Sequence, residues 1–354
     1  MTLPPGSLPD SELPGPAAGT SAPGSLPDSE LPGSSAGASA PGSLPDSELP
    51  GPDAGTIAPG EPLPEPDVEV AEIGLDLGEV QRIVLTALAE DLGVPPRDVT
   101  SESTIPAGQT DTAELVARAD GVVAGLLVAA EVFAATSGGT ATFEAVAADG
   151  DRVRRGDVLA VVSGTTRALL TAERTALNLL CRMSGVATHT RKWADRLEGT
   201  GATVLDTRKT TPGLRVLEKY AVRAGGGTNK RMGLYDVAMI KDNHKLAAGS
   251  ITAAYELVRS TFPDVTVQVE VTTLAEAEEA VAAGADFLLC DNMTPELLTD
   301  VVRAVGDRVE LEATGNLTLE TAAAYAATGV NYLSVGGLTH SSPILDIALD
   351  LRPR

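Results

Sequence analysis

Hydrophobic and polar positions alternate in two different ways along the chain, and the second half shows the more regular pattern. From residue 202 onward, short apolar runs are separated by stretches whose apolar residues recur at helical spacing. The six apolar runs are residues 202–206, 237–241, 265–271, 287–291, 309–313 and 332–335, and the helical stretches are 214–223, 251–260, 274–283, 295–305 and 319–327. Such alternation predicts parallel strands joined by crossover helices. Since a closed barrel has eight strands, we expect a six-stranded, incomplete α/β barrel.

The part of the chain before this pattern has a different organisation. A helical pattern begins near Leu77 and is stopped by Gly93 and the two prolines that follow it closely. Short strands are predicted over 113–119, 141–147 and 158–162, around an apolar helix at 126–136. We therefore expect an α/β sandwich domain over residues 73–180, joined by the C-terminal segment 344–354, and a barrel domain over residues 181–343.

A long helix is predicted over residues 171–198, between these two domains. This interpretation places Arg174 in the first turn, where a cation opposes the helix dipole. Because local rules tend to be broken at functional sites, Arg174 is a candidate functional residue.

Residues 1–72 follow neither pattern. The segment Pro-Gly-Ser-Leu-Pro-Asp-Ser-Glu-Leu-Pro-Gly occurs at 5–15, 23–33 and 41–51. Each repeat offers two leucines among prolines, glycines and acids, which is too little apolar surface to offset the entropy lost on ordering. We predict a disordered tail. The alternative is a linear docking motif that is repeated for avidity.

Charge and cysteine content limit the classes of partner. The formal net charge is -23, and residues 1–73 contain 12 of the acidic residues but no Lys or Arg. An acidic surface disfavours binding to nucleic acids and anionic membranes.

Cys181 and Cys290 stand in apolar runs, as free thiols do in the core of a protein from a reducing compartment. With no signal-peptide pattern and no apolar run approaching 18 residues, we expect a cytoplasmic protein without membrane or nucleic-acid partners.

Against this acidic background, cations gather where the predicted strands end. They are Arg208, Lys209, Lys230, Arg231 and Lys241. Ligands bind at the carboxyl ends of strands in α/β barrels, and arginine pairs with both carboxylates and phosphates. The set predicts a site for a polyanionic small molecule. Lys209 or Lys241 could instead form a Schiff base, as in a barrel aldolase.

Two carboxylates are expected in the same pocket, Glu270 in the third predicted barrel strand and Asp291 at the end of the fourth. They could hold Mg²⁺ through water, accept hydrogen bonds from sugar hydroxyls, or stabilise positive charge on a sugar carbon. The three histidines, His189, His244 and His340, are too dispersed for a metal triad. His244 and His340 follow strand ends and are candidates for lining the pocket.

The last two strand ends are rich in glycine. Thr314-Gly315-Asn316 and Ser334-Val335-Gly336-Gly337 resemble the loops with which many barrels hold a phosphate. Glycine after a strand is also common in ordinary turns, so this pattern is weak by itself. The phosphate-binding interpretation is supported further because the two loops follow the last two strands of the predicted barrel, as they do in those barrels.

Taken together, seven motifs resemble those of quinolinate phosphoribosyltransferase, also called carboxylating nicotinate-nucleotide pyrophosphorylase. They are ERTALN at 173–178, DTRKTTPG at 206–213, GGGTNKR at 225–231, IKDNH at 240–244, VEV at 269–271, CDN at 290–292 and VGG at 335–337. The resemblance covers residues 74–354 and leaves the repeats outside. It implies an N-terminal α/β sandwich followed by an incomplete six-stranded barrel.

The resemblance implies a reaction in NAD synthesis. Quinolinate and 5-phosphoribosyl 1-pyrophosphate give nicotinate mononucleotide, pyrophosphate and CO₂, with Mg²⁺ as cofactor. It also implies a homodimer or a hexamer in which Arg174 enters the active site of the neighbouring subunit.

Roles for individual residues follow from the same resemblance. Lys209, Lys241, Glu270 and Asp291 are expected to be catalytic, with Glu270 and Asp291 near the ribose and, indirectly, the metal. Substrate-binding residues are expected to be Arg174, Thr207, Arg208, Lys209, Lys230, Arg231, Lys241, Glu270, Asp291, Thr314, Gly315, Asn316, Val335, Gly336 and Gly337.

Two positions depart from the family pattern and two alternatives stay open. Lys230 stands where the family usually has histidine, and Asn316 replaces a frequent glycine. Both departures concern substrate geometry more than reaction type. Besides a Schiff-base aldolase, the alternative is a relative of the same fold that acts in metabolite binding or transport.

Overall fold

The structure is a computed structural model that describes residues 74–353. These residues belong to one compact unit. The predicted tail over residues 1–72, with its repeats, lies outside them.

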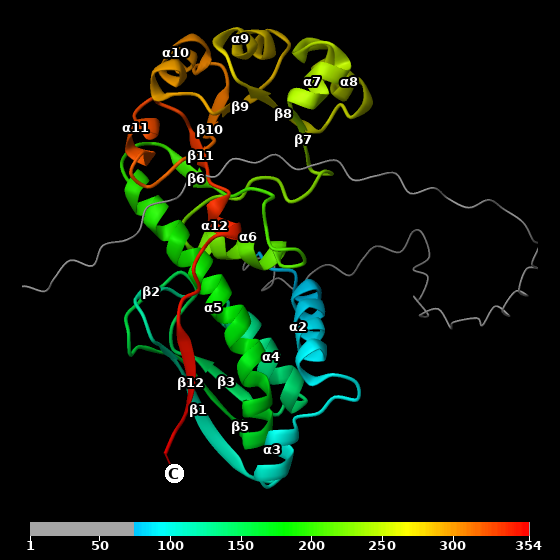
Figure 1. Cartoon of the computed structure of the whole chain (residues 1–354), viewed down its shortest axis with the longest axis vertical. Helices are drawn as coiled ribbons and strands as arrows, with labels where there is room; N and C mark the ends of the chain where they lie inside the picture. Colours follow the sequence, from blue (N-terminus) through cyan, green and yellow to red (C-terminus); the bar gives the residue numbers. More distant parts are fainter. Residues whose placement is uncertain (1–73, 354) are drawn as a thin grey trace, which may run out of the picture. The chain divides into compact units, whose positions relative to one another are not determined.

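Helices and strands alternate through most of the described chain (Figure 1). The helices are α2 (Leu77–Leu92), α3 (Val99–Thr104), α4 (Leu126–Ser137), α5 (Thr166–Leu197), α6 (Arg215–Ala224), α7 (Asp242–Ala248), α8 (Ile251–Thr261), α9 (Leu274–Ala282), α10 (Pro295–Val305), α11 (Ala322–Ala326) and α12 (Gly337–His340). The strands are β1 (Thr110–Ala117), β2 (Gly121–Val122), β3 (Thr142–Ala145), β4 (Arg152–Val153), β5 (Val158–Thr165), β6 (Thr203–Leu205), β7 (Val237–Ile240), β8 (Thr266–Val271), β9 (Phe287–Asp291), β10 (Glu310–Thr314), β11 (Tyr332–Ser334) and β12 (Ile347–Leu351).

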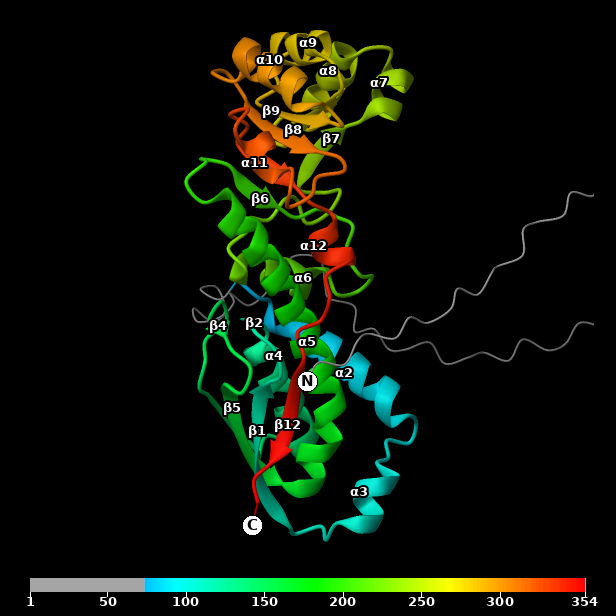
Figure 2. The same ribbon diagram turned by 60° about the vertical axis from the view of Figure 1, so that its left-hand side comes forward.

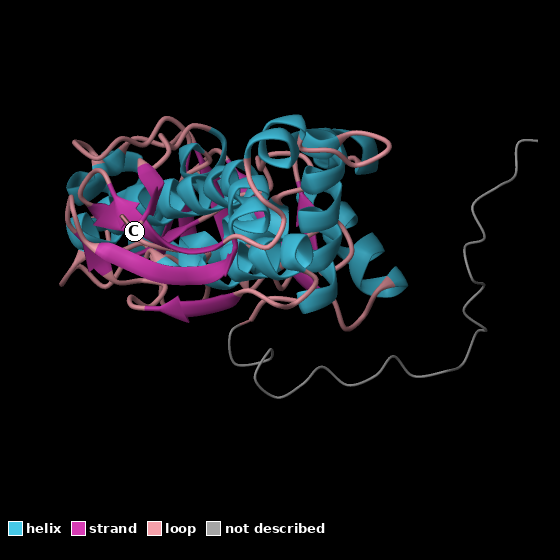
Figure 3. Ribbon diagram, turned by 90° about the horizontal axis from the view of Figure 1, so that it is seen from below, coloured by secondary structure: helices cyan, strands magenta, loops and turns pink. Residues whose placement is uncertain are grey.

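The N-terminal part is built on an antiparallel sheet with strand order β12-β1-β5-β3. Its outer strand β12 comes from the C-terminus, and Leu349 lies opposite Leu115 of β1. Helices α4 and α5 pack against the sheet, and Figure 3 shows the strands in magenta beside the helices in cyan. This part has the antiparallel sheet and the packed helices of the predicted α/β sandwich. The domain boundaries at residues 180 and 344 stay predictions.

The second sheet is parallel, with strand order β6-β11-β10-β9-β8-β7. Strands β6 and β7 are its two edges, so the barrel is open between them. A single bridge joins Leu205 of β6 to Thr228, which places the chain before β7 beside the open edge. The α/β fold with an incomplete six-stranded barrel is therefore confirmed.

Alternating residues of the barrel strands point to the same face, because side chains along a strand have a period of two. On β8 these are Gln268 and Glu270, and on β10 they are Glu312 and Thr314. A hydrogen bond of 2.6 Å between the Gln268 and Glu312 side chains shows that both point into the barrel. Polar side chains thus form two successive layers inside the barrel. Glu270 and Thr314 belong to the layer at the carboxyl ends of the strands, and Gln268 and Glu312 belong to the deeper layer.

Helix α5 is longer than predicted and touches both sheets (Figure 2). It begins at Thr166 rather than at residue 171, and the sequence pattern missed this start because no capping side chain marks it. Arg174 is therefore the ninth residue of the helix and lies beyond its first turn. The prediction that Arg174 opposes the dipole at the helix start is wrong.

Several short elements were not predicted. Helices α3, α7 and α12 and the two-residue strands β2 and β4 are too short to show a period. The helix predicted over 319–327 is confined to α11, Ala322–Ala326. Both cysteines are free and buried, as expected. Within residues 74–353, no helix combines the length and the apolar character that crossing a membrane requires.

Candidate active site

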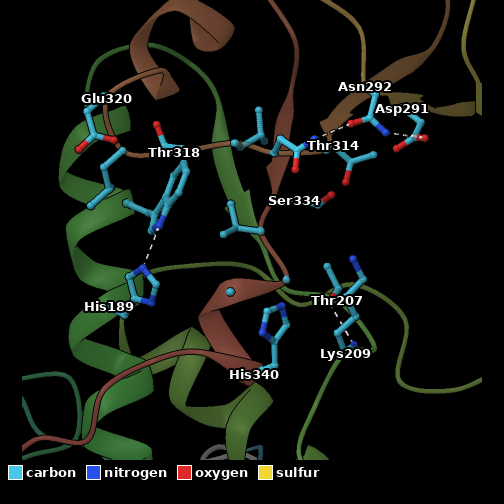
Figure 4. A pocket seen from close by; sticks show the side chains of 18 residues that line it. His189, Thr207, Lys209, Asp291, Asn292, Thr314, Thr318, Glu320, Ser334 and His340 are labelled. Atoms are coloured by element: carbon cyan, nitrogen blue, oxygen red, sulfur yellow. Dashed lines mark hydrogen bonds between the residues drawn. The ribbon is translucent and has the colours of Figure 1, made fainter. Parts of the chain in front are cut away.

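A cavity of about 620 Å³ opens at the carboxyl ends of the barrel strands (Figure 4). Nine residues predicted from the sequence line it: Thr207, Lys209, Asp291, Thr314, Gly315, Asn316, Val335, Gly336 and Gly337. His340, a candidate from its position after a strand, also lines it. Ser334, which the sequence placed in a phosphate-holding loop, and Asn292 of the CDN motif line it too. The sequence reasoning did not assign Trp193 or residues 317–320 to this cavity, because helix α5 and the loop after β10 carry no distinctive motif there.

One wall of this cavity is the loop that follows β10. Gly315 has a φ of 98°, and a Cβ at this position would lie 3.1 Å from the backbone nitrogen of Asn292. Asn316 has a φ of 49° and its amide nitrogen donates to Asn292 Oδ1 at 3.3 Å. Asparagine is one of the few residues that adopt this left-handed conformation readily, so the Asn316 departure fits the local backbone.

The facing wall is the segment between β11 and α12. A Cβ at Gly336 would lie 3.0 Å from Lys209 Cδ and 3.2 Å from His340 Nε2, so any larger residue would crowd both side chains. The Ser334 hydroxyl is buried without a hydrogen-bond partner among the described residues. A polar, glycine-lined cavity with an unpartnered hydroxyl and a lysine can accept an anionic group such as a phosphate.

Next to this cavity lies a cation cluster made of Arg208, Lys230, Arg231 and Lys241. Lys241 Nζ lies 3.6 Å from Glu270 Oε2. Burial lowers the pKa of Arg231, and the nearby Arg208 lowers it further. Burial also lowers the pKa of Lys230; Glu312 opposes this shift, while Arg231 and Lys241 add to it. These mutual effects show that the structure brings the four cations together.

The predicted residues thus form two adjacent groups rather than one. None of the four cations lines the large cavity, and Lys230 and Arg231 border a smaller one of about 200 Å³ with Val237 and Phe287, which begin their strands. The connection between the groups is the segment after β6. Thr207 and Lys209 line the large cavity, and Arg208 between them belongs to the cation cluster.

The segment that carries Lys230 is held by Asp206, the residue that follows β6. Asp206 and Lys219 are both buried, and Lys219 Nζ lies 2.6 Å from Asp206 Oδ1. The Asp206 carboxylate also accepts from the Lys230 backbone N–H at 2.7 Å and from Asn229 Nδ2 at 2.8 Å. Burial raises the pKa of Asp206 and lowers that of Lys219, and their attraction opposes both shifts.

A second buried carboxylate, Glu218 of α6, holds the loop that follows Lys209. It accepts from the Thr211 backbone N–H at 2.9 Å and from the Arg182 guanidinium at 2.7 Å. The sequence reasoning missed Asp206, Glu218, Lys219 and Arg182 as positioning residues. For Glu218 and Lys219, the sequence does offer an indication, because the two charged residues stand next to each other among the apolar residues of a predicted helix.

The histidines have three different environments. His244 Nδ1 accepts from the Lys241 backbone N–H at 3.0 Å, so His244 caps α7 and does not line the large cavity. His189 lines it, and its Nε2 accepts from Trp193 Nε1 at 3.3 Å. Because an indole only donates, His189 Nδ1 carries the proton and donates to Ser342 Oγ at 2.8 Å. Burial lowers the pKa of His189, and Lys192 adds to the shift.

Arg174 lies outside both groups. Its side chain is exposed on α5, and no ion pair is found for it within residues 74–353. The structure therefore does not bring Arg174 to this site.

The carboxylates present suit Mg²⁺ only together with a ligand. Among residues 74–353, no group of three or more His, Cys, Asp or Glu side chains is placed to hold a metal ion. Mg²⁺ is commonly bound by one or two carboxylates plus substrate phosphates. Asp291 in the cavity wall and Glu270 on the neighbouring strand fit that donor set.

Comparison with known proteins gives consistent results over both parts of the chain. The model of the quinolinate phosphoribosyl transferase N-terminal domain matches residues 98–184, and that of the C-terminal domain matches residues 186–350. The nicotinate-nucleotide pyrophosphorylase [carboxylating] of Mycobacterium leprae is 48% identical over 273 residues, which cover 75% of this chain and 94% of that protein. A probable enzyme of the same name from Bacillus subtilis is 42% identical, with 77% and 93% covered.

Solved structures agree. NadC from Streptococcus pyogenes is 38% identical, with a TM-score of 0.75 over 79% of this chain and 99% of that chain. The nicotinate-nucleotide pyrophosphorylase from Francisella tularensis is 34% identical, with a TM-score of 0.74 over 78% and 98%. The chain therefore belongs to the quinolinate phosphoribosyltransferase family.

Proposed function

We propose that the two adjacent groups of the candidate active site bind the two substrates of this family separately. The reaction follows from family membership: quinolinate and 5-phosphoribosyl 1-pyrophosphate give nicotinate mononucleotide, pyrophosphate and CO₂ in NAD biosynthesis. The large cavity would take the phosphoribosyl substrate, and Arg208, Arg231 and Lys241 of the cation cluster would take the carboxylates of quinolinate.

The observation that carries this assignment is the alternation of Thr207, Arg208 and Lys209 between the two groups. A ligand pair that meets at this segment would place the pyridine ring next to the ribose. Arg208 and Arg231 can each bind a carboxylate through two parallel hydrogen bonds, which also fixes the plane of the ring. Arg208 Nε is buried without a partner among the described residues, so a donor is available there.

Transfer of the ribose requires departure of pyrophosphate, which leaves positive charge on the sugar carbon. Lys209 would neutralise the leaving group, and the Asp291 carboxylate would stabilise the cationic sugar, since preorganised charges lower a barrier when they match the transition state. The pyridine nitrogen then forms the new bond to the sugar carbon. Its positive charge accepts the electron pair left when the 2-carboxylate departs as CO₂, and a proton from water replaces that group.

We propose Mg²⁺ as the cofactor, held by the substrate pyrophosphate with Asp291 and Glu270 contributing through water. When bound, the ion would neutralise charge on the leaving pyrophosphate. Family membership decides against the Schiff-base aldolase and against a binding or transport protein.

We also propose a homodimer or hexamer in which Arg174 serves the neighbouring subunit, because its side chain is exposed on the described surface. Two variants that are inactive alone, Arg174→Ala and Lys241→Ala, should recover part of the activity when they are mixed and refolded together. No recovery would exclude a shared site. A cytoplasmic location stays a prediction, supported by two free buried thiols.

The direct test is to incubate the purified chain with quinolinate, phosphoribosyl pyrophosphate and Mg²⁺ and to measure nicotinate mononucleotide. Replacing Arg208 by alanine removes a charge-assisted bidentate contact and should lower kcat/KM about 30- to 1000-fold. The control is Arg303→Ala, which removes an exposed arginine from α10. Equal rates for both variants and the wild type would remove Arg208 from the site.

A further inference from the structure

The barrel interior contains a buried polar group to which no role in the reaction has been assigned so far. Glu312 of β10 is completely buried, and its Oε1 lies 2.6 Å from Lys230 Nζ. Its other oxygen accepts from Gln268 Nε2 of β8 at 2.6 Å. The Lys230 side chain is only 12% exposed. A carboxylate in such a place must be paired, because an uncompensated buried charge is strongly destabilising.

This group lies one layer deeper than the residues assigned to the substrates. Gln268 precedes Glu270 by two positions on β8, and Glu312 precedes Thr314 by two positions on β10. Two residues along a strand correspond to about 7 Å. The Lys230 ammonium, bound to the deeper carboxylate, therefore points below the substrate layer.

The main chain of Lys230 is fixed as firmly as its side chain. Its N–H donates to Asp206 at 2.7 Å, and its carbonyl accepts from Lys219 Nζ at 3.0 Å. The pair Glu312 and Lys230 thus anchors the far end of a segment whose next residue is Arg231. A lysine carries its ammonium at the end of a flexible four-carbon stem, which lets the Lys230 side chain extend from this fixed backbone to Glu312.

We infer that Glu312 is a positioning residue for the reaction: with Gln268 it holds Lys230 inside the barrel as its counter-ion, and Lys230 does not contact the substrate. The inference rests on the proposed function and changes the expected role of Lys230 from binding quinolinate to supporting Arg231. Burial lowers the pKa of Lys230, and the Glu312 carboxylate opposes that shift, as a counter-ion does.

A cycle of variants tests this role. Lys230→Met leaves the Glu312 charge uncompensated, and Glu312→Gln leaves the lysine uncompensated, so both single variants should unfold at lower urea and lose activity. The double variant Lys230→Met/Glu312→Gln removes both charges with little change in shape. We expect its urea midpoint to recover and its KM for quinolinate to return to within about threefold of wild type, because coupled residues are strongly non-additive.

The inference is overturned if the double variant recovers its urea midpoint but keeps a KM for quinolinate raised about tenfold or more, because Lys230 would then bind the substrate directly. A second measurement does not depend on the stability of the variants. In a crystal structure of the wild-type chain with quinolinate, Lys230 Nζ should remain bound to Glu312 and out of hydrogen-bond distance of the ligand. A contact between Nζ and a quinolinate carboxylate would overturn the inference.

Failure of the proposed function would give a different result. If the wild-type chain does not turn over quinolinate, the proposed substrate is wrong. The urea midpoints still report whether Lys230 and Glu312 form a coupled pair.

Discussion

The buried pair of Asp206 and Lys219 offers the sharpest test of how the fold supports the site. Neither side chain is exposed by more than 1%, and their charged atoms are 2.6 Å apart. Asp206→Ala leaves Lys219 charged in a place without solvent. Breaking a buried pair in this way costs about 3–5 kcal/mol. The same substitution removes the acceptor of the Lys230 backbone N–H, so kcat/KM should fall as well.

The free energy of unfolding is obtained from urea titration of the wild type and the variant. An exposed ion pair of equal length, Arg152 with Asp195, serves as the matched control. Because surface pairs contribute little, Asp195→Ala should leave the urea midpoint nearly unchanged. Asp206→Asn/Lys219→Met, which removes both charges, should recover most of the lost stability.

The reasoning is refuted if Asp206→Ala loses less than about 1 kcal/mol, as an exposed pair would. It is also refuted if the double variant is no more stable than Asp206→Ala. Either result would mean that the carboxylate does not depend on its buried partner.

Two further predictions concern titratable groups. Burial raises the pKa of Cys290 to about 12 and also raises the pKa of Cys181. Iodoacetamide at pH 8 should therefore label neither thiol in the native protein and both thiols in urea, as detected by mass spectrometry. Labelling of Cys290 in the native protein would contradict its burial. The folded pKa of His189 is lowered, so the unfolded state takes up its proton first as the pH falls below about 6.5, and stability is lost from there down to the folded pKa. His189→Gln should therefore lose less stability than wild type between pH 7 and pH 5, measured by thermal unfolding, and identical losses would refute the shift.

Much of the barrel could be predicted because its signals are local. Apolar runs such as 287–291 and helices such as Pro295–Val305 are visible as periodic patterns, and β9 and α10 have the expected bounds. The candidate cations could be recognised because lysine and arginine at strand ends stand out in an acidic chain. The start of α5 could not be placed, since Thr165 offers no capping hydrogen bond from its side chain.

The pairing of distant side chains was beyond the reach of sequence patterns. Lys230 and Glu312 are 82 positions apart, and nothing local at Lys230 indicates that its ammonium turns into the barrel. The pattern likewise showed that Arg208 and Lys209 are adjacent, but not that they belong to different groups. That division depends on the direction of each side chain, which only the folded segment after β6 sets.

The central claim, that the two substrates occupy two adjacent groups, is tested most directly by crossed initial-rate kinetics of two variants. Gly315→Ala would force a side chain at a φ of 98° against Asn292 in the wall of the large cavity. It should raise KM for phosphoribosyl pyrophosphate about tenfold or more and leave KM for quinolinate nearly unchanged, whereas Arg208→Ala should do the reverse. If both variants raise the two KM values equally, the substrates are not divided between these groups, and the account is contradicted.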